Sequence, residues 1–193
     1  TAKGFRTNQQ GWWFRDKSEV LTRKTKLEWI VSENWNQQEI SQRGKLNDFL
    51  LRKKILLVGA GCIGASVAEI LVRSGVYNFT IADSDIFEIG NLSRHVLNIG
   101  NVGEFKELSL CSYLNSLNPH ANIKVINDTL TIDEEYKTNI ALDKYDIIID
   151  CTGENSVLDV FQKADFRKSH IISSISVGLG AKHLYMTIMS GTT

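Results

Sequence analysis

The segment from residue 59 to residue 106 holds most of the residue types that could bind and activate a nucleotide. It opens on Gly59, Gly61 and Gly64, which follow an apolar run and precede a helical pattern. In a strand–turn–helix unit the first glycine permits a tight turn, the second lets the backbone approach a phosphate, and the third lets helix and strand pack closely. The free N–H groups at the start of such a helix favour an anion. These glycines therefore predict nucleotide binding.

Charged and amide side chains follow the glycines in a fixed order. Asp83 ends a second apolar run, where this kind of unit places the acceptor for ribose hydroxyls. An NAD site needs only that acidic residue, yet this chain adds Asp85, Asn91, Arg94 and Lys106. Arginine and lysine bind phosphates and neutralise charge as pyrophosphate leaves, and Asp85 can share Mg²⁺ with phosphate oxygens. The order favours ATP, with NAD as the second candidate, although Arg94 and Lys106 alone could be solvated surface charges.

Strands and helices that would position these residues alternate along the chain from Lys53 onward. Apolar runs predict strands over Ile55–Val58, Phe79–Ala82, Ile123–Asn127, Tyr145–Asp150 and His170–Ser174. Helical patterns cover Gly64–Ser74, Lys106–Asn118, Asp133–Leu142 and Val157–Arg167. This alternation predicts an α/β fold, a doubly wound, mainly parallel, Rossmann-like sheet with helices on both faces. Residues 186–193 resemble a strand entering a turn, so we expect a fragment of a longer chain.

Residues 1–50 differ from the rest and contain all four tryptophans. We expect an N-terminal helical extension or linker there, and an ATP-binding adenylation domain, C-terminally incomplete, over residues 51–193. The stretch Thr25–Leu51 is typical of one or two amphipathic helices. Its candidate buried positions are Trp29, Ile30, Ile40, Leu46, Phe49 and Leu50. The extension is either a helical collar packed on the domain or a remnant of, or linker to, an upstream domain.

Composition narrows the function classes. The 22 acidic and 22 basic residues cancel, which gives no argument for nucleic-acid or membrane binding. No apolar run approaches the roughly 20 residues of a membrane helix, and the N-terminus has no signal-peptide core. The three cysteines form no CxxC pair, so neither a zinc site nor a disulfide framework is indicated. We therefore expect a cytoplasmic protein.

Five motifs after the glycines resemble, in order, those of ubiquitin-activating enzymes and their bacterial ThiF-type adenylyltransferase relatives. The motifs are Asp83-Ser84-Asp85, Asn91-Leu92-Ser93-Arg94-His95, Val102-Gly103-Glu104-Phe105-Lys106, Asn118-Pro119-His120 and Asp150-Cys151-Thr152. The resemblance covers about residues 43–190. It implies ATP–Mg²⁺-dependent adenylation of the C-terminal carboxylate of a ubiquitin-like or sulfur-carrier protein, by a homodimer or pseudo-dimer.

The same resemblance implies roles for particular residues. Asp83 would bind ribose, and Asn91, Arg94 and Lys106 would bind the phosphates. In the relatives an arginine before the first strand reaches the partner subunit's nucleotide, and Arg43 is the candidate here. His95 replaces the commoner glutamine, and with the Arg43-Gly44 pair it looks more like bacterial activating enzymes of ubiquitin-like conjugation operons, including antiphage defence systems.

Two departures from the family pattern bear on function. The relatives carry a magnesium-binding aspartate after the last motif, whereas this chain has Glu154 one residue later, which we take as the candidate metal ligand. Enzymes that pass the activated protein onward need a nucleophilic cysteine. Cys62, Cys111 and Cys151 are instead expected to be inert. Because Gly153-Glu154 departs from the family pattern, a catalytically silent half of a pseudo-dimer, which only binds a ubiquitin-like partner, is the alternative from another functional class.

Overall fold

The structure, a computed structural model, describes residues 15, 18, 22–26, 28–41, 43, 46–133, 135, 137–164, 166 and 169–191. By its contacts the chain divides into two units, Thr1–Trp35 and Asn36–Thr193. The second unit carries all the strands of the described chain, and it begins upstream of the boundary at residue 51 that the sequence predicts.

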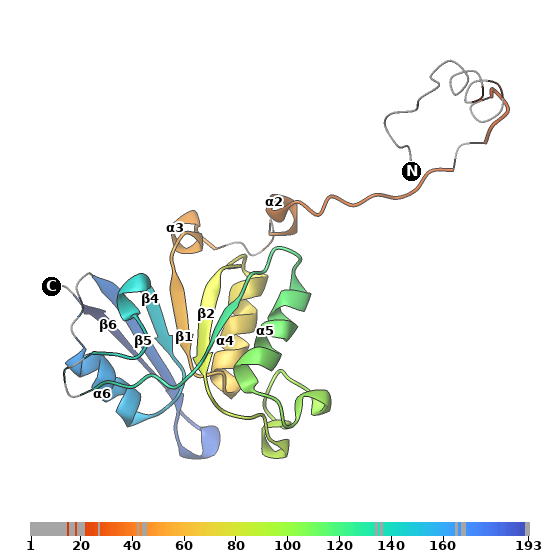
Figure 1. Ribbon diagram of the computed structural model, residues 1–193. Helices are drawn as coiled ribbons and strands as arrows, with labels where there is room; N and C mark the ends of the chain where they lie inside the picture. Colours follow the sequence, from red (N-terminus) through yellow and green to blue (C-terminus); the bar gives the residue numbers. More distant parts are fainter. Residues whose placement is uncertain are drawn as a thin grey trace. The chain divides into compact units, whose positions relative to one another are not determined.

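Six strands form one sheet in the order β3-β2-β1-β4-β5-β6 (Figure 1). They are β1 (Ile55–Val58), β2 (Phe79–Asp83), β3 (Lys124–Asn127), β4 (Ile147–Asp150), β5 (His170–Val177) and β6 (Leu184–Gly191). Neighbouring strands from β3 to β5 are parallel, and β6 runs antiparallel to β5 along its whole length. The predicted doubly wound, mainly parallel sheet is therefore confirmed.

Three longer helices cover the two faces of this sheet. They are α4 (Cys62–Arg73), α5 (Lys106–Leu117) and α6 (Asn155–Lys163). Helices α4 and α5 lie on one face, and α6 lies on the other (Figure 1). Short 3₁₀ turns span Ile89–Asn91, Ile99–Asn101, Leu142–Lys144 and Leu179–Ala181. The predicted end of α6 at Arg167 lies outside the described residues.

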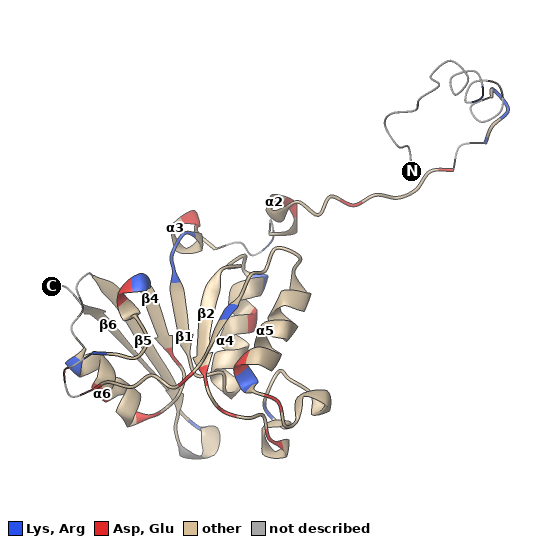
Figure 2. Cartoon of the chain, viewed as in Figure 1, with Lys and Arg blue, Asp and Glu red and all other residues tan. Residues whose placement is uncertain are grey.

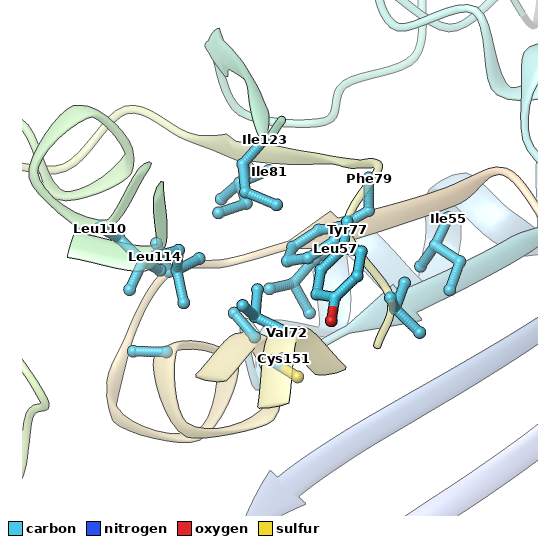
Figure 3. Close-up of a cluster of buried hydrophobic side chains, with 14 residues drawn as sticks. Ile55, Leu57, Val72, Tyr77, Phe79, Ile81, Leu110, Leu114, Ile123 and Cys151 are labelled. Atoms are coloured by element: carbon cyan, nitrogen blue, oxygen red, sulfur yellow. The ribbon is translucent and has the colours of Figure 1, made fainter. Parts of the chain in front are cut away.

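The alternation of side chains along β1 divides the core into two clusters. Ile55 and Leu57 pack with Ile81 of β2 and with Leu110 and Leu114 of α5 (Figure 3). On the opposite face Leu56 and Val58 join residues of β4 and α6, namely Ile148, Val157, Val160 and Phe161. All four residues of β1 are buried, as expected of a strand covered on both faces. This burial fixes the position of the glycine turn that follows Val58.

The predicted helix over Asp133–Leu142 is wrong. Glu134 and Tyr136 lie outside the described residues, and the rest form a turn and an isolated antiparallel bridge between Ile132 and Thr138. The Asp133 carboxylate accepts the backbone N–H groups of residues 135 and 137, and Asn139 bonds back to Asp128 and Thr131. Such side-chain-to-backbone bonds offer the chain an alternative to the helix.

The predicted amphipathic helices over Thr25–Leu51 are also largely wrong. The described residues hold only two single-turn helices, α2 (Gln37–Ile40) and α3 (Asp48–Leu51). Four of the six candidate buried positions are 39% to 91% exposed, namely Trp29, Ile30, Ile40 and Phe49. The other two, Leu46 and Leu50, are half-buried. Helices of this length are marginal without a packed face, and serine and asparagine compete for backbone groups.

In the described part of the chain, no helix combines the length and the hydropathy needed to cross a bilayer.

Candidate nucleotide-binding site

The sheet order places a topological switch point between β1 and β4. From β1 the chain crosses to β2 on one side, and from β4 it crosses to β5 on the other. In open α/β sheets ligands bind outside the carboxyl ends of the strands at such a point. The loops after β1, β2 and β4 meet there, because these strands are parallel neighbours. The motif residues after the glycines therefore lie at the carboxyl ends of the strands. The exception is the turn at Asn118-Pro119-His120, which follows α5 at the amino ends of the strands.

The glycine turn joins β1 to α4 with very little space around its backbone. Gly59 has φ +90°, and its N–H donates to the Ala82 carbonyl at 2.8 Å. A Cβ on Gly64 would lie 1.9 Å from the Gly59 carbonyl oxygen, so only glycine fits there. A Cβ on Gly61 would meet nothing within 4 Å. Gly61 is the N-cap of α4 and offers no side-chain cap, which leaves this helix start open toward an anion.

Asp83 stands at the end of β2 with its carboxylate already positioned. Its Oδ2 accepts the Ala60 N–H at 2.5 Å, and its Oδ1 accepts the Asp85 N–H at 2.7 Å. The side chain is half-buried. A carboxylate has about four lone-pair sites, so both oxygens retain acceptor capacity. Asp83 is therefore held in place beside the glycine turn and remains able to accept ribose hydroxyls.

Lys106 begins α5 and lies against Asp85. Its Nζ donates to Asp85 Oδ2 at 2.7 Å, and its backbone N–H donates to the Asp85 carbonyl at 2.9 Å. The Lys106 side chain is only 12% exposed, while that of Asp85 is 68% exposed. The acidic loop after β2 and the basic start of α5 thus share the same end of the sheet (Figure 2). This pairing orients the ammonium group at the edge that also holds Asp83.

The loop after β2 carries Asn91 and Arg94. Asn91 Oδ1 accepts the Glu88 N–H at 3.0 Å and closes a capping box around a 3₁₀ turn. Arg94 is exposed, and its carbonyl accepts the thiol hydrogen of Cys62 at 2.7 Å. Asn91 therefore stabilises the conformation of the loop, and Arg94 is exposed on the surface of the loop.

His95 ties the same loop to the glycine turn. Leu97 N–H donates to Nδ1 at 3.2 Å, so the ring hydrogen is on Nε2, which donates to the Ala60 carbonyl at 2.8 Å. The ring packs edge-on against Phe87, with centroids 5.0 Å apart. Burial lowers the pKa of His95, and the positive charge of Lys106 acts in the same direction. The imidazole is therefore neutral at neutral pH.

The end of β4 supplies a buried carboxylate that the sequence did not single out as a site residue. Asp150 is 1% exposed, and it accepts hydrogen bonds from Thr152 N–H and Oγ1 and from Ser174 Oγ at 2.7–3.0 Å. The signal was an acidic residue closing an apolar strand. Asp150 shapes the loop that leads to Glu154, since Thr152 Oγ1 also accepts the Glu154 N–H at 3.1 Å.

The candidate metal ligand, Glu154, is an exposed residue at the N-cap of α6. Its Oε2 accepts the Ser156 hydroxyl at 3.2 Å. Among the described residues no cluster of three or more His, Cys, Asp or Glu side chains could hold a metal ion. Mg²⁺ usually takes one or two carboxylates together with substrate phosphates. A single exposed glutamate on this edge fits a metal held mainly by the phosphates.

Arg43 lies far from these groups within its own chain. Ser41 and Leu46, on either side of it, lie beside Gly75 and Ser74 at the end of α4, and Arg43 itself is exposed. Helix α4 is 12 residues long, which is about 18 Å, and the glycine turn is at its other end. Gln42 and Gly44 lie outside the described residues. Arg43 therefore lies near the amino ends of the strands, whereas Lys106 lies at their carboxyl ends.

The cysteines show the features of structural residues. Burial raises the pKa of the Cys151 thiol to about 12, with a further contribution from the charge of Asp150. Burial also raises the pKa of Cys111, whose thiol donates to the Ile123 carbonyl. Cys62 is half-buried and donates to the Arg94 carbonyl. The raised pKa values of Cys111 and Cys151 are the opposite of what an activated nucleophile needs.

A family model described as the ThiF family matches residues 32–187. The ATP-dependent ubiquitin transferase-like protein Cap2 of Enterobacter hormaechei is 32% identical over 98% of this chain and 31% of its own length. The adenylyltransferase and sulfurtransferase UBA4 of Candida albicans is 32% identical over 81% of this chain and 32% of its own. The chain thus spans about a third of the length of these relatives. The structure of E. coli MccB has the same fold, with a TM-score of 0.59 and 23% identity over 67% of this chain and 36% of its own.

Proposed function

Because this chain belongs to the ThiF family, we propose that it is the ATP-binding part of an adenylyltransferase. Its substrate is the C-terminal carboxylate of a ubiquitin-like or sulfur-carrier protein. The observation that carries this proposal is the gathering of Asp83, Lys106 and the Arg94 loop around the glycine turn. An NAD-dependent oxidoreductase is not favoured, because the family match and these phosphate-binding cations both point to ATP.

Each group at the site has a part in binding the nucleotide. The backbone of the glycine turn and the start of α4 receive phosphate oxygens. Asp83 accepts the ribose hydroxyls. The planar guanidinium of Arg94 and the compact ammonium group of Lys106 contact the phosphate oxygens. Mg²⁺, where Glu154 contributes a ligand, would screen charge on the phosphates. The positions of these side chains at the carboxyl ends of the strands support the assignments.

The reaction is acyl adenylation. A carboxylate oxygen of the carrier protein forms a bond with the α-phosphorus of ATP, and the bond from that phosphorus to the bridging oxygen breaks, which releases pyrophosphate. No proton transfer is required, since a C-terminal carboxylate is ionised at neutral pH. Lys106 and Arg94 stabilise the charge that develops on the phosphates, so catalysis rests on positioning and electrostatics.

The relatives guide the choice of carrier. Cap2 is named as a ubiquitin transferase-like protein and matches almost the whole chain. We therefore expect a ubiquitin-like carrier whose flexible tail enters the site, in a cytoplasmic homodimer. In such a dimer Arg43, which lies at the opposite edge of its own sheet, would act on the partner's nucleotide.

ATP–pyrophosphate exchange with a purified cognate carrier tests the proposal. Lys106→Ala and Arg94→Ala should each slow exchange by about two to three powers of ten, as the loss of one such charge contact often does. Lys124→Ala, on β3 far from these groups, is the matched control and should leave exchange unchanged. Exchange that persists at the wild-type rate in both site variants would exclude this assignment. ATP binding without any exchange would favour the silent pseudo-dimer half.

A further inference from the structure

We propose that His95 and Cys62 are positioning residues that lock the Arg94 loop onto the glycine turn. The inference rests on the proposed function, because it concerns how Arg94 is presented to the phosphates of ATP. Neither residue touches the nucleotide in this assignment. Each one bonds to a main-chain carbonyl of the other segment, and together they set the distance between the two phosphate-binding segments.

The two bonds cross the same gap in opposite directions. His95 belongs to the Arg94 loop and donates through Nε2 to the Ala60 carbonyl of the glycine turn at 2.8 Å. Cys62 belongs to the start of α4 and donates through Sγ to the Arg94 carbonyl at 2.7 Å. Because the second bond ends on Arg94 itself, the main chain of that residue cannot move without breaking it. Two bonds also fix orientation, which one alone would not.

Neighbouring contacts make the ring of His95 a rigid connector. Leu97 N–H occupies Nδ1, and Phe87, which is fully buried, packs against the ring. Ala60 is also held from its other side, because its N–H donates to Asp83 Oδ2. The ribose acceptor, the glycine turn and the Arg94 loop therefore form one hydrogen-bonded unit. A ligand that binds any part of this unit finds the other parts in place.

The hydrogen-bond pattern requires the neutral imidazole. A proton added at Nδ1 would face the Leu97 N–H and remove the acceptor for it. Burial lowers the pKa of His95 below its ordinary value of 6.5, and Lys106 acts in the same direction; the bond to the Ala60 carbonyl and the charge of Asp83 oppose this shift without reversing it. Because the folded-state pKa is depressed, the contribution of the bond from Leu97 N–H to Nδ1 is present above about pH 6.5 and is lost as pH falls through the folded-state value.

Loss of this lock should act through Arg94. Displacing a positioned group by about 1 Å can cost a hundredfold in rate. We therefore expect His95→Leu to lower kcat/KM for ATP in pyrophosphate exchange by about ten- to a hundredfold. His95→Gln, which keeps a donor and an acceptor on one planar group, should stay within about threefold of wild type. Cys62→Ala should lower the same parameter, and Cys62→Ser should restore it.

A double-mutant cycle separates positioning from general stability. In an Arg94→Ala background, His95→Leu should change exchange and ATP affinity by less than about threefold, because the group that it positions is gone. Melting temperatures of all variants, and His120→Leu at the other edge of the sheet as a control, account for effects on folding. The inference is overturned if His95→Leu has equal effects in both backgrounds, or if the Cys62 pair shows no difference between alanine and serine.

The outcomes also separate this inference from the proposed function. If the wild-type protein shows no exchange with its carrier, the proposed function itself is refuted. If the wild-type protein shows exchange that depends on Arg94 but not on His95 or Cys62, only the positioning role is refuted. If His95→Leu does not fold, the two Cys62 variants still decide the question, because each changes one thiol and leaves the imidazole ring in place.

Discussion

Replacing Gly64 by alanine should destabilise the protein and abolish nucleotide binding together. The added Cβ would lie 1.9 Å from the Gly59 carbonyl oxygen and 3.3 Å from the Cys151 Cβ. Ordinary contact begins near 3.4 Å, so the first separation is short by 3.4 − 1.9 = 1.5 Å. The oxygen belongs to the main chain, and therefore α4 or the turn must shift. Alanine also lies within the helix, where it is favoured over glycine by up to about 1 kcal/mol.

Overpacking of this kind costs about 1–3 kcal/mol and occasionally more. The severity of the clash places Gly64→Ala at or above the upper end, which leaves a net loss of about 2 kcal/mol after the gain in helix propensity. For a chain of this size each kcal/mol lowers the melting temperature by about 2–4 °C. We therefore expect a decrease of about 4–8 °C in calorimetry, with loss of ATP binding in titrations of the same samples.

Gly61→Ala is the matched control, three residues away in the same turn. Its Cβ would meet nothing within 4 Å, and its φ of −70° suits alanine. The loss of a good N-cap residue and the gain from a less flexible unfolded chain are of similar size, so stability should change by less than about 0.5 kcal/mol. ATP affinity should still fall, because the methyl group occupies the space that a phosphate approaches. Equal melting temperatures for the two variants would refute this account of the turn.

Two further predictions concern the end of β4. Asp150→Asn should lower the free energy of unfolding by about 2–3 kcal/mol, because an NH₂ group would face hydrogens from Thr152 or Ser174 in a fully buried position. Denaturant titration measures this loss, and an unchanged midpoint would contradict the hydrogen-bond assignment. Cys151, with its pKa raised to about 12, should resist iodoacetamide at pH 8 in the folded protein and react only after unfolding, as mass spectrometry of the labelled peptides would show. Rapid labelling of the folded protein at pH 8 would contradict this prediction, because it would show that the thiol is accessible. Because the folded thiol holds its proton more tightly, its contribution to stability is complete below about pH 9 and declines as pH rises toward 12.

The sequence predicted the sheet because burial on both faces leaves continuous apolar runs. Strand β1 is a run of four buried aliphatic residues, and Asp83 and Asp150 follow such runs at the point where backbone leaves the sheet. The glycine spacing predicted the turn that follows β1, since a side chain at position 64 would clash with the Gly59 carbonyl oxygen. These features depend on local residue type and therefore appear in one sequence.

Other features depend on partners that no local pattern reveals. Asp133 could have capped a helix, but its carboxylate accepts N–H groups of residues 135 and 137 in a turn, and Asn139 bonds to the segment around Asp128. The apolar residues Trp29 and Ile30 suggested a buried helix face, yet both are exposed in the first unit. Helix α5 carries Glu107, which is fully buried and bonds to the Asn127 side chain; nothing in its sequence position indicated either fact. Contacts between distant segments decide such cases.

The double anchoring of Asp83 has a consequence for which nucleotides the site accepts. Amide hydrogens from Ala60 and Asp85 hold one carboxylate oxygen each, so the group cannot swing aside to admit a larger or charged substituent on the sugar. A ribose with two free hydroxyls meets two acceptors. A ribose phosphorylated at the 2′ or 3′ position would meet a fixed negative charge instead. In the proposed complex, the aspartate that accepts the sugar hydroxyls would therefore also repel NADP-like and coenzyme A-like nucleotides.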